Sequence, residues 1–248
     1  MRYGLVGFLI TGLSLVLMSC TGVMMTRLSP SPESRQVLSD EIRSDFNSII
    51  DFRGTATLTF DSPEQSGRVN SEIHTRPYFK ATIDLKMPFG GQAGRVEIRE
   101  NFVAFYTPDG TLKYIGSPED AGIPGLPSIF TGSTDILRVL IGAINLPERS
   151  EAKFIRESRD HSRFVWEYVS DSLRQEYWID PVVRRVVKYK ETPIANGNTI
   201  TIDLSKYLVI DGIQLPRSIT VMQPGEKRMF SIYYNDIEII RNEYAYVR

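Results

Sequence analysis

The feature that most constrains the fold is an alternation of apolar and polar residues that begins after Gly54. Four segments in the first half show it, and all are rich in Thr, Val, Ile, Phe and Tyr: 55–60, 79–85, 95–98 and 102–106. When the pattern repeats every two residues, one side of the strand faces the core and the other side faces solvent. The chain is therefore predicted to be mainly β, with antiparallel strands.

Short turn sequences containing proline, glycine and aspartate separate these segments, at 61–63, 88–91 and 108–110. A second series of strands is predicted from Ala152 onwards. Its turns are expected at 158–160, 170–171, 180–181, 196–197, 211–212 and 224–225. Strands of this length at regular spacing favour a meander in a barrel or a strongly curved sheet. Because no repeat of fixed length is evident, both series are predicted to belong to one domain, 35–248.

Two helices are expected beside the strands. Pro32 suits a first helical turn, and apolar residues follow it at helical spacing: Leu38, Ile42, Phe46 and Ile49. Between the two strand series, the segment 122–127 is too rich in glycine and proline for regular structure. The segment 134–142 is predicted to be a short helix with Ser133 or Thr134 as its N-cap.

The N-terminus has the pattern of an export signal. Arg2 supplies a positive charge, and an apolar run of about 14 residues extends from Leu5 to Met18. A bilayer-spanning helix needs roughly 20 residues, so this run favours a cleaved signal peptide. The run ends in Leu17-Met18-Ser19-Cys20, which resembles a bacterial lipobox, although Met18 is bulkier than the usual residue. Residues 1–19 are predicted to be the signal peptide and 20–34 the lipidated N-terminus and linker.

Cysteine usage supports lipidation of Cys20. It is the only cysteine in 248 residues, so it has no partner for a disulfide within the chain. The alternatives are an ordinary secretory signal or a short membrane anchor that happens to contain a cysteine. With two or more acyl chains attached, the mature protein would be held stably on a membrane without spanning it.

Composition argues against several function classes. The chain has 29 basic and 30 acidic side chains without a clustered basic stripe, which disfavours a nucleic-acid partner. His74 and His161 are its two histidines, too few for a usual zinc site without a second cysteine. No nucleophile elbow, P-loop or dinucleotide-binding fingerprint is present. The protein is predicted not to be an enzyme and to carry no cofactor other than the lipid on Cys20.

Several motifs, in matching order over about 35–240, resemble the LolA/LolB family of periplasmic lipoprotein carriers and receptors. Each motif is weak alone, and the resemblance depends on their order and spacing. They are an opening strand at 52–54, a basic-proline-aromatic strand entry at 75–79, a proline-apolar-glycine loop at 87–90 leading into 95–98, a central helix and turn at 135–147, and closing strands that include 177–180 and 211–216. The loop and the central helix resemble the LolB-type receptor most closely.

The resemblance implies an open, curved half-barrel of about eleven antiparallel strands with a helical lid over its concave face. The cavity of that fold is apolar and accepts acyl chains. Strand residues that would line it here are Leu58, Phe60, Phe79, Ile83, Leu85, Val103 and Phe105, and the lid would contribute Leu38, Ile42, Phe46, Leu137, Leu140 and Ile141. The alternative is that all of these residues pack a closed core, as most such residues do.

Two residues are assigned roles through the resemblance. Phe89 occupies the position of a protruding apolar residue on the receptor loop that helps to hand lipid to the membrane, with an aromatic ring in place of an aliphatic side chain. The alternative is that Phe89 folds back over the sheet edge. Arg76 resembles a carrier arginine that latches the lid, and the alternative is a plain surface cation.

The resulting expectation is an envelope lipoprotein that binds acyl chains of lipids or lipoproteins and helps insert or localise them in the outer membrane, with a periplasmic carrier protein as a possible partner. Thr21 follows Cys20, and by analogy with enterobacteria, where aspartate at that position causes inner-membrane retention, it permits export to the outer membrane, facing the periplasm. The alternative is a non-enzymatic structural or sensing lipoprotein of the same fold that binds a protein partner. Sensing regulators of this kind carry a further C-terminal domain, and this chain ends soon after the last predicted strand pair, which disfavours the sensing role but leaves the structural one open.

Overall fold

The computed structural model describes residues 32–77, 79–99, 102–117, 136–147, 153–195 and 197–242. The predicted signal peptide, Cys20 and most of the linker therefore lie outside the described residues. The first part of the described chain forms α1 (Pro32–Ser48), β1 (Ile49–Asp61), β2 (Ser66–Arg76), β3 (Lys80–Lys86), β4 (Gln92–Arg99), β5 (Phe102–Tyr106) and β6 (Leu112–Gly116). The second part forms α2 (Ile136–Leu140), β7 (Lys153–Asp160), β8 (Arg163–Val169), β9 (Leu173–Asp180), β10 (Arg185–Pro193), β11 (Ile200–Ile210), β12 (Ile213–Gln223), the 3-10 turn η1 (Pro224–Glu226) and β13 (Arg228–Arg241).

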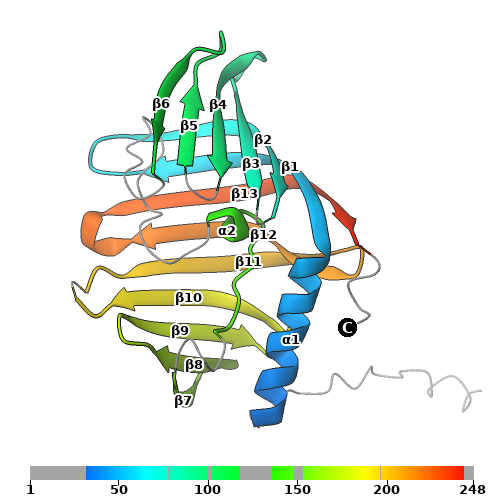
Figure 1. Cartoon of the computed structure of the whole chain (residues 1–248), viewed down its shortest axis with the longest axis vertical. Coiled ribbons are helices and arrows are strands. Elements are labelled where there is room, and N and C mark those ends of the chain that lie inside the picture. The colour runs from blue at the N-terminus through cyan, green and yellow to red at the C-terminus, as the bar shows by residue number, and fades with distance from the viewer. Residues whose placement is uncertain are drawn as a thin grey trace, which may run out of the picture.

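All thirteen described strands belong to one antiparallel sheet in the order β6-β5-β4-β3-β2-β1-β13-β12-β11-β10-β9-β8-β7. Neighbours in sequence pair throughout each half, and the long β1–β13 pair joins the two halves at the centre. β6 and β7 are the two edges, so the sheet is unclosed. Figure 1 shows β4–β6 running steeply across the direction of β8–β12, which gives the sheet its strong curvature. The predicted open, curved, mainly β fold is confirmed.

The sheet has thirteen described strands where the resemblance implied about eleven, and two strands of the first half are absent from the segments that the sequence alternation indicated. One of them is β2, where the inward positions include Ser71 and Thr75, both buried although polar. Polar residues at inward positions obscure the alternation on which the prediction depends. The other is the short edge strand β6, of which Leu112 and Ile115 are exposed.

The predicted first helix is confirmed, and it begins at Pro32. Leu38, Ile42 and Phe46 are almost completely buried and belong to the same apolar cluster as the inward residues of the sheet. Ile49, which continues the spacing, is instead the first residue of β1 and is also buried. Figure 1 shows α1 standing across the ends of the strands in the second half of the sheet.

α2 is shorter than the predicted helix, and residues 133–135 lie outside the described part of the chain. The helix stops because Gly142 follows it with a φ of 74°, a conformation that glycine adopts without strain. A Cβ at this position would lie 2.1 Å from Cγ of Pro216 on β12. Gly142 thus lets the chain leave α2 in close contact with the centre of the sheet.

Tyr234 on β13 fastens α2 to the inner face of the sheet. Its hydroxyl donates a hydrogen bond to the carbonyl oxygen of Leu140 over 2.6 Å, and its ring packs edge-on against Phe52. Gly54 makes room for this ring, since a Cβ there would lie 2.7 Å from Cδ1 of Tyr234. Complete burial raises the pKa of the Tyr234 hydroxyl, so it stays protonated and remains a donor.

The turns of the second strand series lie near their predicted places, with one correction. The segment 158–160 was expected to be a turn but is the end of β7, and the chain turns at His161 and Ser162. His161 takes a positive φ of 56°, a turn conformation that histidine adopts more readily than most residues. No described helix is both long enough and apolar enough to cross a membrane.

Candidate functional site

The inner face of β1–β6 carries most of the strand residues predicted to line an acyl-chain cavity. Leu58, Ile83 and Val103 are buried in the core. A further group is only partly buried while packing against that core: Phe60, Val69, Leu85, Phe105 and Tyr114. This half of the sheet therefore offers apolar side chains that neighbouring groups do not cover completely.

The helices supply the remaining apolar residues that were predicted. Leu137, Leu140 and Ile141, in α2 and directly after it, are buried and share one cluster with the inward side chains of the sheet and with α1. The structure therefore brings the strand and helix sets together, which both the acyl-chain cavity and the packed-core alternative imply. In the described part of the chain these residues pack against one another, so an acyl chain would have to enter by displacing side chains or a helix.

Phe79 is the exception among the predicted cavity residues. It was expected to lie within a strand, but β3 starts at Lys80, and the Phe79 side chain is 74% exposed. The reason is the preceding Pro77, which favours a turn that closes when the Phe79 N–H donates to the Arg76 carbonyl over 3.0 Å. Phe79 lies at the rim of the sheet, outside its inner face.

Arg76 contacts the sheet, and its role as a latch of the lid stays a prediction. Its Nε lies 3.8 Å from Oδ2 of Asp51 on β1, and the described residues show no hydrogen bond from it to a helix. Asp51 is buried and also contacts Nε2 of His74 at 2.8 Å and Nε of Arg53 at 3.2 Å. Desolvation raises the pKa of Asp51, but the hydrogen bonds and charges of His74 and Arg53 outweigh it and leave the pKa below 3.8.

Phe89 lies at the tip of the β3–β4 turn with its side chain fully exposed. The Met87 N–H donates to the Gly91 carbonyl over 3.0 Å and closes the turn. Gly90 and Gly91 have φ of 91° and 86°, which other residues adopt only with strain. The ring therefore projects into solvent and does not fold back over the sheet edge, a geometry compatible with contact with a membrane or a partner.

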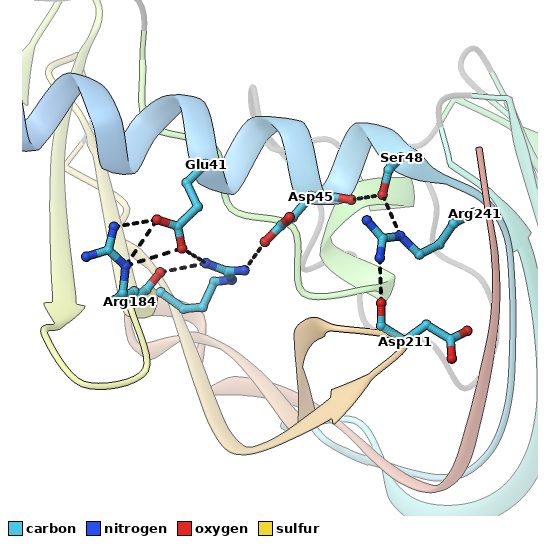
Figure 2. A network of polar contacts seen from close by, with 7 residues as sticks. Glu41, Asp45, Ser48, Arg184, Asp211 and Arg241 are labelled. Carbon is cyan, nitrogen blue, oxygen red and sulfur yellow. Dashed lines mark hydrogen bonds and ion pairs between the residues drawn. The ribbon is translucent and has the colours of Figure 1, made fainter. Parts of the chain in front are cut away.

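A polar network that the sequence did not indicate fastens α1 to the sheet (Figure 2). Nε of Arg184 donates to Glu41 over 3.0 Å, and Arg185 contacts both Glu41 and Asp45. Partial burial raises the pKa of Glu41, but hydrogen bonds and charges from the two arginines outweigh this and hold the pKa below 4.5. The partners are more than 130 positions apart in the chain, so no local pattern could reveal them.

The C-terminal end of α1 is held in the same way. The Ser48 hydroxyl donates to the Asp45 carbonyl over 2.7 Å and accepts from Nε of Arg241 over 3.1 Å. Arg241 also donates to the Asp211 carbonyl in the β11–β12 turn (Figure 2). Polar contacts at the rim thus complement the apolar contacts made by the buried face of α1.

An open cleft of about 820 Å³ lies at the sheet rim, where β1 begins and the β2–β3 turn, the end of β4 and the end of β13 meet. It has both apolar and charged walls: Asn47, Ile49, Ile50, Asp51, Arg76, Pro77, Phe79, Lys80, Arg99 and Ile240. No group of three or more His, Cys, Asp or Glu side chains placed to hold a metal ion occurs among the described residues.

An unclosed, curved antiparallel sheet with helices on its inner face is the fold of the LolA superfamily. No protein-family model matches the sequence, and no curated protein matches it. Solved structures do share the fold. A LolA-superfamily protein from Nitrosomonas europaea aligns with a TM-score of 0.54 at 11% identity, covering 84% of this chain and 94% of that one.

Two further structures are similar. A DUF1329-family protein from Desulfovibrio piger has a TM-score of 0.61 at 14% identity and covers 84% of this chain and 92% of that one. A domain described as a putative outer membrane lipoprotein-sorting protein from Vibrio parahaemolyticus has a TM-score of 0.57 at 12% identity, covering 82% and 91%. At these identities the likeness establishes the fold.

Proposed function

We propose that this protein is a membrane-anchored envelope lipoprotein that binds acyl chains of lipids or lipoproteins on the inner face of its sheet and helps to insert or localise them in the outer membrane. The observation that carries the proposal is the apolar inner face of β1–β6, where Phe60, Leu85 and Phe105 are only partly covered. The lipoprotein-sorting and LolA-superfamily descriptions of the similar structures support the same class of ligand. The anchor would be the lipid on Cys20.

The energetics favour an acyl ligand on such a surface. Each methylene transferred from water to an apolar environment contributes about 0.8 kcal/mol, so a long acyl chain gains on the order of 10 kcal/mol before the costs of binding. Part of the bound chain would replace contacts that the inward side chains now make with one another. Displacement of α1 would break the ion pairs that Glu41 and Asp45 make with Arg184 and the buried Arg185, so burial of the acyl chain would have to offset that cost.

The proposal is tested by measuring whether lipid co-purifies with the protein. The full chain with Cys20→Ser, which removes the anchor's own acyl chains, is extracted with organic solvent and the extract is examined by mass spectrometry. Saturable binding of a fluorescent 16-carbon acyl probe is then measured. We expect co-purified lipid and saturable binding of the probe.

A matched pair of substitutions locates the binding surface. Leu85→Ser changes the inner face, whereas Ile115→Ser changes an exposed position on β6. We expect the first to weaken binding of the probe about tenfold and the second to leave it unchanged, because only Leu85 would contact the chain. Absence of both lipid and probe binding would support the packed, structural alternative.

A further inference from the structure

Three cations face one another across β2, β3 and β4. Arg76 lies directly opposite Lys80, and Lys80 lies directly opposite Arg99. Directly opposed residues of antiparallel strands share one face of the sheet, with Cβ atoms about 5 Å apart. The neighbouring row, Phe52, Thr75, Ala81, Ile98 and Val103, is buried, so the cationic row lies on the outer face.

The described residues neutralise only part of this charge. Asp51 lies 3.8 Å from Nε of Arg76, but it also contacts His74 and Arg53. Among the described residues, no carboxylate lies within 4.0 Å of the charged nitrogens of Lys80 or Arg99. Like charges directly opposite one another are destabilising, so an anion bound here would relieve a repulsion that is built into the strand register.

Exposed apolar side chains stand beside these cations in the 820 Å³ cleft. Ile50, Phe79 and Ile240 are 50%, 74% and 52% exposed. Large apolar groups that gather at one exposed place mark contact with a membrane or a partner. The cleft therefore combines positive charge and hydrocarbon within one site, and its volume falls in the range of small-molecule sites, about 300–1,000 Å³.

We propose that this cleft is a docking site for the anionic phospholipids of a membrane surface. The lipid phosphate would lie among Arg76, Lys80 and Arg99, since guanidinium groups match phosphate oxygens in charge and shape. Phe79, Ile50 and Ile240 would contact the boundary between headgroups and acyl chains. An amphiphile fits because it presents an anion and a hydrocarbon side by side. The site is separate from the inner face and does not depend on acyl chains binding there.

The cleft is also separate from Phe89. The row and the β3–β4 turn lie at opposite ends of β3, about 20 Å apart along the strand. If β3 stood upright on a bilayer, only one of the two ends could reach the headgroups. Substitutions at each end therefore report on different contacts.

The test is sedimentation with vesicles, using the full chain with Cys20→Ser. Vesicles of phosphatidylcholine alone are compared with vesicles in which about a third of the lipid is phosphatidylglycerol. The row variant carries Arg76→Gln, Lys80→Gln and Arg99→Gln. The control loses the same charge at exposed cations elsewhere: Arg68→Gln, Lys113→Gln and Lys227→Gln. Residues 1–19 are common to all variants, so their own affinity cancels in the comparison.

We expect the protein with an intact cationic row to bind phosphatidylglycerol vesicles more tightly than vesicles of phosphatidylcholine alone. The row variant should bind the phosphatidylglycerol vesicles about 100-fold more weakly, since each cation near an anionic surface contributes about 1 kcal/mol. The control triple should change binding little. Phe79→Ser should weaken binding to both kinds of vesicle. Because loss of Arg76 removes a partner of Asp51, the double variant Lys80→Gln with Arg99→Gln keeps that pair, and a loss of about 30-fold is expected.

Three outcomes would overturn the proposal. Equal losses in the two triple variants would indicate a diffuse effect of charge. If the protein with an intact cationic row bound both vesicle compositions equally, the cleft would not recognise anionic lipid. Saturable binding of inorganic phosphate that is lost in the row variant, with vesicle binding equal in the row variant and the unsubstituted protein, would assign the cleft to a free anion.

Discussion

At the residue scale, the Tyr234 hydroxyl has a defined energetic role. It is fully buried and is held 2.6 Å from the Leu140 carbonyl. Tyr234→Phe removes the donor and leaves a buried carbonyl unsatisfied, so we expect a loss of about 1–3 kcal/mol in the free energy of unfolding. Tyr233→Phe is the matched control, because Tyr233 is half-buried and its ring lies beside Lys206 and Arg217. Urea unfolding of both variants measures the difference, and equal losses would contradict this role.

Single residues also show which positions can be predicted from the sequence. The resemblance predicted that Phe89 projects, and the tight turn formed by Pro88 and the following glycines places its ring in solvent. Phe79 was placed wrongly because alternation was extended through the Pro77 turn into a residue that precedes β3. The backbone preferences of proline and glycine therefore explain the position of both rings. Phe79 was misplaced because the periodicity was given more weight than Pro77.

At the element scale, α1 shows which part of an element a sequence can reveal. The spacing of Leu38, Ile42 and Phe46 indicated both the helix and its buried face, because that information is local. The two arginines that bind Glu41, Arg184 and Arg185, reach it only once the complete sheet has formed. Long-range ion pairs of this kind leave no pattern along the chain.

The pH dependence of α1 docking follows from Glu41. Its pKa in the folded protein lies below the ordinary 4.5, so its stabilising contribution is present above pH 4.5 and is lost as the pH falls through the folded value. Glu41→Gln should cost about 1–3 kcal/mol near neutrality and progressively less below pH 4.5. Unfolding free energies measured across this range test the expectation.

Glu72→Gln is the control for that series. Glu72 pairs with Lys86 over 3.1 Å, but its side chain is 60% exposed, so the substitution should cost less than about 1 kcal/mol at any pH. A Glu41→Gln effect that stayed constant with pH would show that the carboxylate charge does not fasten α1. An effect as small as that of Glu72→Gln would show the same.

At the scale of the whole molecule, the two halves of the sheet differ in the features that accompany their apolar face. α1 crosses the strand ends of the second half, and α2 is fastened to the centre through Tyr234 and Gly142. Partly covered apolar residues occur on both halves, but the half formed by β1–β6 also carries the Phe89 turn and the cationic row. Ligand binding and membrane contact would therefore be concentrated in one half of the molecule.

Phe89 tests whether delivery to membranes depends on that half. Phe89→Glu should leave the free energy of unfolding within about 0.5 kcal/mol, because a fully exposed tip has no packing to lose. It should nevertheless reduce transfer of a labelled lipoprotein into liposomes, because a carboxylate resists entering the acyl region. Phe89→Leu is the control and should retain transfer, since it keeps an apolar side chain on the same turn. A large loss of stability would mean that the ring packs against the protein, and normal transfer by the stable glutamate variant would mean that the turn only joins β3 to β4.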